Sequence, residues 1–327
     1  MANRNASAEL FCWDFQINAA IVLMLENILN ADSVRVEAKS EDIEVVLNDS
    51  TTIYAQAKAV VDPYDYRHVN DKLRDALETL NEAAANGDGS KFIYVTNSAN
   101  PFGNQHTMYS FNGNARLSYN DLPPQCKQKV QQFVADIREV MLDLDKFTVR
   151  AIPFESNDLE HRYRYIIDTI NRLLSKIDLY EVSVGNKIMS IWQGDFFHNS
   201  SKPDTSIVIS KNDMMWPLIV LIIDRAACMR YKRDLEENEI IEINRYYDEV
   251  IKQQSANYGL ISWVLTGFQE KDDSPSLFVD HHWQEYTDIV EGLELDKFTR
   301  ETLIKIIMYR IITERDAINK LKQEVGI

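Results

Sequence analysis

Polar and charged side chains are concentrated in one short stretch of the chain, between residues 37 and 58. The stretch holds the acids Glu37, Glu41, Asp42 and Glu44, followed by the sequence Gln56-Ala57-Lys58. Carboxylate and amide oxygens are hard ligands of the kind that Mg²⁺ prefers, and few carboxylates plus a substrate phosphate is its usual binding mode. A metal ion there would polarise a phosphodiester and activate a water, while a lysine amine would stabilise charge on the phosphate. These residue types are sufficient for phosphodiester hydrolysis.

The same residues fall on segments that predict β-strands. These segments are rich in Val, Ile and Thr and cover residues 34–38, 42–47 and 52–60, with the turn-forming cluster Asn48-Asp49-Ser50 between the last two. Because side chains alternate along a strand, one face of this hairpin carries Asp42, Glu44, Gln56 and Lys58, and the other face is apolar. With the turn centred on Ser50, Asp42 lies opposite Lys58 and Glu44 opposite Gln56. Such cross-strand pairs also occur on solvated sheet faces, so spacing alone leaves a purely structural role open.

Further elements must position this hairpin. A helix over residues 8–29 precedes it and carries Gln16, since apolar residues recur there at three- and four-residue spacing. After the hairpin, the pattern predicts a helix over 68–85, a buried strand over 92–96, a loop over 97–120, a helix over 121–144 and a strand over 147–153. A helix that connects two strands is typical of α/β folds. We therefore expect a first domain, residues 1–154, of α/β (α+β) class, with a central mixed sheet flanked by helices.

The second half of the chain is mostly helical by pattern. Helical periodicity covers residues 158–177, 213–233, 238–255 and 296–323, and short strand candidates lie near 181–191 and 206–210. We expect a mostly α-helical assembly or regulatory domain over residues 155–327. An apolar stripe that runs from Leu295 to Ile311 fits either a domain core, which is the commoner case, or a subunit interface.

Composition excludes several functional classes. The 327 residues are 45% hydrophobic and 26% charged, as in globular proteins, and 51 acidic against 35 basic residues give a net charge of −16, unlike proteins that bind nucleic acid through their overall field. No glycine-rich pattern of the dinucleotide-binding or Walker A type is present. Three widely separated cysteines indicate a reducing compartment, and the longest apolar run, Pro217–Ile223, is too short to span a membrane. We expect a cytoplasmic protein without a membrane partner.

Gln16 on a helix, Asp42 on a strand and Gln56-Ala57-Lys58 on the next strand together resemble the PD-(D/E)xK nucleases of restriction-endonuclease-like fold, in the Mrr-like branch where Gln replaces the second acid. The stretch from about residue 8 to 154 is most similar to the double-stranded DNA endonuclease domain of CD-NTase-associated antiphage effectors. The resemblance implies that Asp42 is the principal ligand of Mg²⁺ or Mn²⁺, that Gln56 offers its carbonyl oxygen to the metal and that Lys58 is the catalytic lysine. It also implies that Gln16 supports the site and that either Glu37 or Glu44 supplies a supporting acid. The chain departs from the family pattern because it has no Pro-Asp before the first acid and no carboxylate at position 56.

The whole chain looks like the nuclease subunit of Lamassu-type or related three-component antiphage systems. That resemblance implies an SMC-like ATPase and a small accessory subunit as partners, and a homo-oligomer when the enzyme is active. Since a net charge of −16 repels DNA, cleavage would wait for assembly. The expected function is a metal-dependent endonuclease effector, a hydrolase of double-stranded DNA in bacterial antiphage defence. The alternatives are a catalytically silent nuclease-fold scaffold in the same kind of complex, and an enzyme of this fold that acts on RNA or on a restricted repair substrate.

Overall fold

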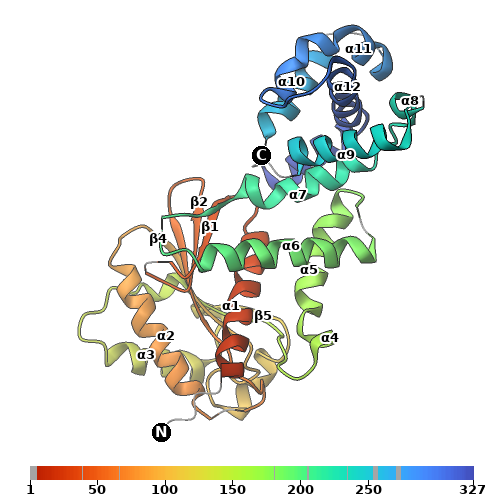
Figure 1. Cartoon of the computed structure of the whole chain (residues 1–327). Coiled ribbons are helices and arrows are strands. Elements are labelled where there is room, and N and C mark those ends of the chain that lie inside the picture. Colours follow the sequence, from red (N-terminus) through yellow and green to blue (C-terminus); the bar gives the residue numbers. More distant parts are fainter. Residues whose placement is uncertain are drawn as a thin grey trace. The chain divides into compact units, whose positions relative to one another are not determined.

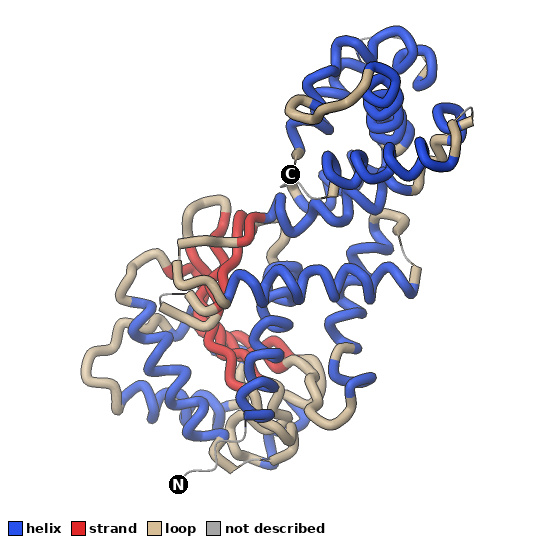
Figure 2. The backbone as a smooth tube through the Cα atoms, viewed as in Figure 1, coloured by secondary structure: helices blue, strands red, loops and turns tan. Residues whose placement is uncertain are grey.

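A computed structural model describes residues 6–38, 40–65, 67–179, 181–204, 206–233, 235–252, 257–269 and 274–327 (Figure 1 and Figure 2). The chain divides into two compact units. The first comprises Met1–Leu174 and Glu181–Lys211, and the second comprises Ser175–Tyr180 and Asn212–Ile327. The first unit therefore includes helical segments beyond residue 154, which we had expected in the C-terminal domain.

The first unit is built around a seven-stranded mixed sheet. Its helices are α1 (Ala6–Glu26), α2 (Val69–Ala84), α3 (Pro124–Ala135), α4 (Leu159–Arg162), most of α5 (Arg164–Lys176) and α6 (Val182–Ser200). Its strands are β1 (Ala31–Val36), β2 (Ile43–Leu47), β3 (Thr52–Lys58), β4 (Gly89–Thr96), β5 (Ala115–Ser118), β6 (Phe147–Ala151) and β7 (Ile209–Ser210). The strand order is β5-β6-β4-β3-β2-β1-β7, with parallel pairing of β3 with β4 and of β4 with β6, and antiparallel pairing elsewhere. A mixed sheet flanked by helices, as expected for an α/β class, is confirmed.

Helices cover both faces of this sheet (Figure 1). On one face α2 packs against β3 and β4, and α3 packs against α2. The core there includes Leu73 and Leu77 of α2 together with Tyr54, Phe92 and Phe147 of three neighbouring strands. On the other face α1 and α6 contact β1 and each other. Because α1 is buried on most of its surface, it carries apolar residues on nearly all sides, as a core helix does.

Helix α1 is long and apolar enough to cross a membrane, by the length and composition of Ser7–Glu26 alone. Core helices of soluble proteins meet the same criterion, and 61% of the apolar window of α1 is buried within the structure.

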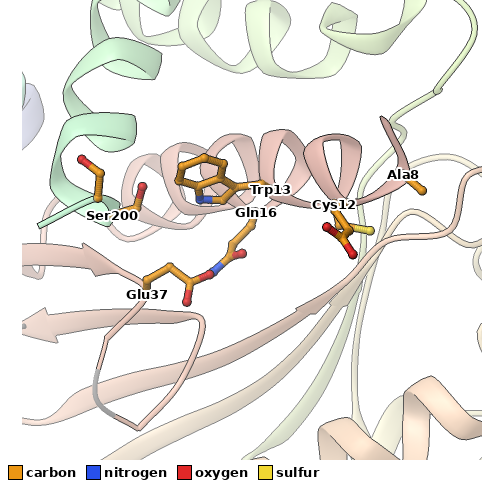
Figure 3. A pocket seen from close by; sticks show the side chains of 8 residues that line it. Ala8, Cys12, Trp13, Gln16, Glu37 and Ser200 are labelled. Carbon is orange, nitrogen blue, oxygen red and sulfur yellow. The ribbon is translucent and has the colours of Figure 1, made fainter. Parts of the chain in front are cut away.

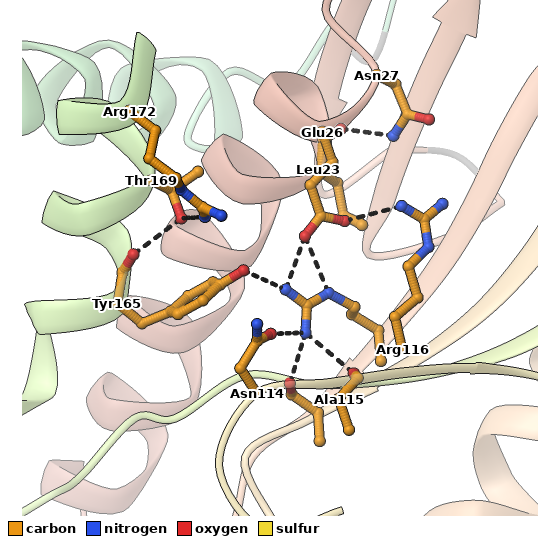
Figure 4. Close-up of polar contacts among 11 residues, drawn as sticks. Leu23, Glu26, Asn27, Asn114, Ala115, Arg116, Tyr165, Thr169 and Arg172 are labelled. Atoms are coloured by element: carbon orange, nitrogen blue, oxygen red, sulfur yellow. Dashed lines mark hydrogen bonds and ion pairs between the residues drawn. The ribbon is translucent and has the colours of Figure 1, made fainter. Parts of the chain in front are cut away.

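A buried arginine fastens α1 to the sheet (Figure 4). Arg150 on β6 is 1% exposed and donates to Glu26 Oε1 at the end of α1, over 2.7 Å from Nη2 and 3.1 Å from Nε. The same guanidinium donates to Asn114 Oδ1, to the carbonyl of Ala115 and to the hydroxyl of Tyr165 on α5. A buried charge is tolerated only when it is paired and hydrogen-bonded, and this one is both. The network therefore holds α1, β5, β6 and α5 together.

The register of the β2–β3 hairpin differs from our expectation by two residues. Glu44 pairs with Tyr54 and Val45 with Ile53, so the turn is centred on Asp49 and not on Ser50. Ser50 adopts a left-handed conformation with φ 66°, and the Leu47 amide donates to the Thr51 carbonyl over 2.8 Å, which closes a three-residue loop. The Asp49 carboxylate accepts hydrogen bonds from the Thr51 amide and hydroxyl. The expected pairs of Asp42 with Lys58 and of Glu44 with Gln56 are therefore wrong. A two-residue shift leaves every side chain on its expected face, however.

Three other elements depart from the sequence patterns. The strand expected near residues 181–191 is wrong, because this segment belongs to α6. Ile188, Trp192 and Phe196 recur every four residues and are fully buried, so helical packing outweighs the strand preference of the valines at its start. The loop expected over 97–120 contains β5, and the helix expected over 121–144 ends at Ala135.

The described part of the second unit contains helices and no strand. They are α7 (Lys211–Asp224, whose first residue lies in the first unit), α8 (Met229–Lys232), α9 (Glu237–Ile251), α10 (Tyr258–Gln269), α11 (Pro275–His282), the 3₁₀ segment η4 (Trp283–Val290), α12 (Lys297–Thr313) and α13 (Arg315–Val325). Helix α12 packs against α9, α10, α11 and η4. Leu303, Ile306 and Ile311 are buried, while Phe298 at the start of the same stripe is 53% exposed. Most of the apolar stripe therefore forms core.

Candidate active site

The candidate site lies at the carboxyl end of β3, next to the loop that leads into β2. Asp42 directly precedes β2, and its Oδ2 atom accepts hydrogen bonds from Gln56 Nε2 over 2.7 Å and from the Ala57 amide over 3.0 Å. Lys58 follows on the same strand face as Gln56 and is half-buried. The structure thus brings Asp42 and Gln56 into direct contact. Among the described residues Lys58 makes no hydrogen bond or ion pair, so its amine remains available to a ligand.

Gln16 reaches this site from α1, on the opposite side of the loop. Its Nε2 atom donates to the main-chain carbonyl of Asp42 over 3.1 Å, and the Glu37 amide donates to the same carbonyl over 2.8 Å. Gln16 is buried, and its contact is with the backbone of Asp42 and not with the carboxylate. Gln16 therefore helps to hold the main chain of Asp42 in place, and so determines where its side chain begins.

Glu37 and Glu44, the two candidates for the supporting acid, lie in different surroundings. Glu44 is half-buried, and its carboxylate accepts hydrogen bonds from the main-chain amides of Ser40, over 3.2 Å, and Glu41. Glu44 therefore holds the β1–β2 loop in shape. Glu37 is exposed, has a left-handed backbone with φ 52° and extends toward Gln16 at the rim of a pocket (Figure 3). Its negative charge acts on Asp42 through space.

A third acid, Glu41, was not among our expected site residues. Its side chain is 3% exposed, and neither of its carboxylate oxygens has a hydrogen-bond partner among the described residues. Burial raises the pKa of the Glu41 carboxyl to about 9, and the neighbouring Asp42 charge adds to the increase, while the Lys58 ammonium opposes it. Strand alternation could not identify Glu41, because it lies in the loop before β2. The one signal in the sequence was its place directly before Asp42.

The electrostatics of the site are dominated by burial and by the Lys58 amine. Burial raises the pKa of the Asp42 carboxyl, while the Lys58 ammonium and the hydrogen bonds from Ala57 and Gln56 act in the opposite direction. Lys58 also opposes the increase in the pKa of the Cys12 thiol, which burial raises. The ammonium group is therefore within electrostatic reach of Asp42, Glu41 and Cys12, which lie on different elements.

The oxygen atoms of the site fit a divalent cation. Gln56 is 3% exposed, and because its amide nitrogen donates to Asp42, its Oε1 atom is a buried acceptor without a partner among the described residues. Unpartnered buried oxygens are costly unless a cation or a water satisfies them. No group of three or more His, Cys, Asp or Glu with metal-site geometry occurs in the described part of the chain. A site that includes an amide oxygen does not depend on such a group, and hard oxygen donors of this type suit Mg²⁺ or Mn²⁺.

A pocket of about 690 Å³ opens beside the site (Figure 3). It is lined by Ala8, Glu9, Cys12, Trp13 and Gln16 of α1, by Glu37, and by Ser200 and Ser201 at the end of α6. Its two acids make it unsuited to a free anion, and its indole ring offers a flat apolar surface. Since Gln16 and Glu37 belong to both the pocket and the support of Asp42, a molecule in the pocket would lie next to the candidate site.

Comparisons with protein-family models, with curated proteins and with solved structures each found no match for this chain.

Proposed function

We propose that the chain is a metal-dependent endonuclease that hydrolyses phosphodiester bonds of double-stranded DNA, and that its first unit has the restriction-endonuclease-like fold. One observation carries the proposal. The Asp42 carboxylate lies in hydrogen-bond contact with Gln56, whose carbonyl oxygen is buried without a partner among the described residues, and Lys58 follows on the same strand face. An acid, an amide oxygen and an amine at one strand end are the groups that a metal-assisted hydrolysis requires.

The residues have separate tasks in this reaction. Asp42 and Gln56 would hold Mg²⁺ or Mn²⁺, which supplies Lewis-acid polarisation of the scissile phosphate and a more acidic water. Lys58 would orient that water and stabilise the negative charge that develops on the phosphate oxygens. Gln16, which donates to the Asp42 carbonyl, and Glu44, which holds the loop, keep the first acid in place. Glu37 sits at the rim, where its charge acts on Asp42.

The charge of the chain supports a requirement for partners. At a net charge of −16 the free chain repels the DNA backbone, which carries one negative charge per about 1.7 Å of duplex. We infer that cleavage follows assembly of a homo-oligomer with an SMC-like ATPase and a small accessory subunit in the cytoplasm, as an effector of antiphage defence. A weak affinity of the isolated chain for duplex DNA that falls further with salt would agree with this inference.

Cleavage of supercoiled plasmid tests the proposal. The chain would be incubated with Mg²⁺, with Mn²⁺ or with EDTA, alone and with the products of its adjacent genes. With the partners present we expect nicked and linear DNA with either metal, and none with EDTA, whereas the chain alone should cleave less. Asp42→Asn and Lys58→Ala should abolish cleavage, and Lys187→Ala, at an exposed lysine of α6, should leave it unchanged. Cleavage that survives both site substitutions would refute the assignment.

A catalytically silent scaffold with the same fold is the second candidate. The identity of residue 56 favours it, because Gln56 contributes no charge to hold a metal. Absence of cleavage in every combination of metal and partner, together with intact complex formation by Asp42→Asn, would favour the scaffold.

A further inference from the structure

The Glu41 carboxylate is buried, and hydrogen bonds hold the main chain of Glu41 in place. Main-chain amides of Ser40 and Glu41 donate to the Glu44 carboxylate, and the Ala38 amide donates to the Glu41 carbonyl over 3.1 Å. The backbone of Glu41 is therefore fixed on both sides, while both oxygens of its side chain lack a hydrogen-bond partner among the described residues. A buried carboxylate whose oxygens lack partners is costly unless a cation or a water satisfies it.

In each of the two neighbouring site residues, one side-chain oxygen receives no hydrogen bond from the described residues. Asp42 receives both of its described side-chain hydrogen bonds on Oδ2, which leaves Oδ1 to solvent or a ligand. The amide of Gln56 is oriented by its donation to Asp42, which leaves Oε1 buried and without a described partner. Glu41 directly precedes Asp42 in the sequence, and the Asp42 side chain is hydrogen-bonded to Gln56 across the hairpin. Glu41 and Gln56 thus hold buried oxygens without a described partner, and both residues adjoin Asp42.

The charges around Glu41 make this arrangement unfavourable without a cation. Among the described residues that act most strongly on Glu41, Asp42, Glu44 and Glu82 are acids and Lys58 is a base. Oxygen donors that are gathered, desolvated and mutually repelling are the usual surroundings of a bound Mg²⁺ or Mn²⁺. A neutral Gln56 and a single Asp42 carboxylate would supply only one negative charge to a divalent ion, and a second carboxylate balances it.

We propose that Glu41 is the second carboxylate ligand of the divalent cation that Asp42 and Gln56 hold. This inference rests on the proposed function, since it completes the same cation site. It assigns the supporting acid to Glu41 in place of Glu37, which is exposed at the rim, and Glu44, which holds the loop.

Binding of Mn²⁺, followed by electron paramagnetic resonance of the free ion, tests this role without DNA. The full chain should bind Mn²⁺, and Glu41→Gln should weaken that binding at least tenfold. Glu82→Gln removes an exposed acid within reach of Glu41 and should change the affinity less than twofold. Glu41→Asp keeps the charge and should retain more affinity than Glu41→Gln, and circular dichroism checks that each variant is folded.

The outcomes separate this inference from the proposed function. Wild-type affinity in folded Glu41→Gln, with binding and cleavage both lost in Asp42→Asn, would overturn the role of Glu41 and leave the nuclease proposal intact. Equal weakening by Glu41→Gln and Glu82→Gln would also overturn it, because the effect would then be one of general charge. A wild-type chain that neither binds Mn²⁺ nor cleaves DNA would overturn both.

Discussion

Burial of Glu41 predicts an unusual pH dependence of stability in the metal-free protein. The Glu41 carboxyl has a pKa of about 9 in the folded chain, against an ordinary value of 4.5. Between these two values the folded state keeps a proton that the unfolded state has released, so stability falls as the pH rises. Each pH unit in that window costs about 1.4 kcal/mol from this group, which amounts to about 3 kcal/mol between pH 6 and pH 8. Glu41→Gln cannot ionise, so it should lose this contribution and be more stable than the wild type at pH 8.

Unfolding by urea in EDTA, at pH 6, 7 and 8, measures the effect. Resonances of 5-fluorotryptophan separate the two compact units, because Trp13 and Trp192 lie in the first, whereas Trp216, Trp263 and Trp283 lie in the second. We expect the free energy of unfolding reported by Trp13 and Trp192 to fall more steeply with pH in the wild type than in Glu41→Gln. Glu82→Gln, which removes an exposed acid, should keep the wild-type slope.

Two results would refute this reasoning. Parallel curves for the wild type and Glu41→Gln would show that Glu41 does not hold a proton in the folded state near neutral pH. A slope that changes equally in Glu82→Gln would show that the net charge, and not the burial of Glu41, governs the response.

Three further substitutions test the packing that positions the site. Glu26→Ala leaves the buried Arg150 guanidinium without its counter-charge and should destabilise the first unit by about 3–5 kcal/mol in the same urea assay. Asn97→Ala removes the buried amide that links the chain after β3 and β6, through hydrogen bonds to Val60 and Phe154, and should cost about 2–4 kcal/mol. Gly267→Ala on α10 places a methyl group against the buried hydroxyl of Tyr286, so it should destabilise the second unit by about 1–3 kcal/mol, although alanine favours helix. Stabilisation of the second unit, as Gly→Ala normally gives within a helix, would show that the Tyr286 ring moves aside.

Local periodicity was sufficient to predict most elements of the first unit. The β-favouring residues of β1, β2 and β3 and the amphipathic spacing of α2 reflect contacts that each segment makes along its whole length. The short strands β5 and β7 have four and two residues, and they exist because a neighbouring strand offers free main-chain groups. Such pairing depends on the tertiary fold. The local sequence pattern therefore does not predict β5, and the pattern near 206–210 gives only a short strand candidate for β7.

The site was predictable where it depended on side-chain alternation alone. Asp42 and Gln56 lie together because a hairpin keeps residues of one parity on one face in any register that differs by two. The register itself depended on the left-handed backbone of Ser50, a conformation that serine adopts rarely and that its sequence context does not specify. The burial of Glu41 depended on the loop contacts of Glu44, which involve main-chain amides and therefore leave no residue pattern.

One face of β3 contributes to both the core and the candidate site. Its side chains change from packed aromatic to polar along the strand. Tyr54 shares its face with Gln56 and Lys58, yet its ring packs 6.0 Å from that of Phe92 in the core, and its hydroxyl donates to Asp88 over 2.8 Å. The polar set is therefore confined to the carboxyl end of the strand, where a metal and a phosphate would have access. Because α2 covers Tyr54 and the residues beside it, the sheet can position Gln56 from a rigid base. By its spacing alone, this polar hairpin face also fits a plain solvated sheet. In the structure it has buried oxygens at one end and packed aromatic rings at the other.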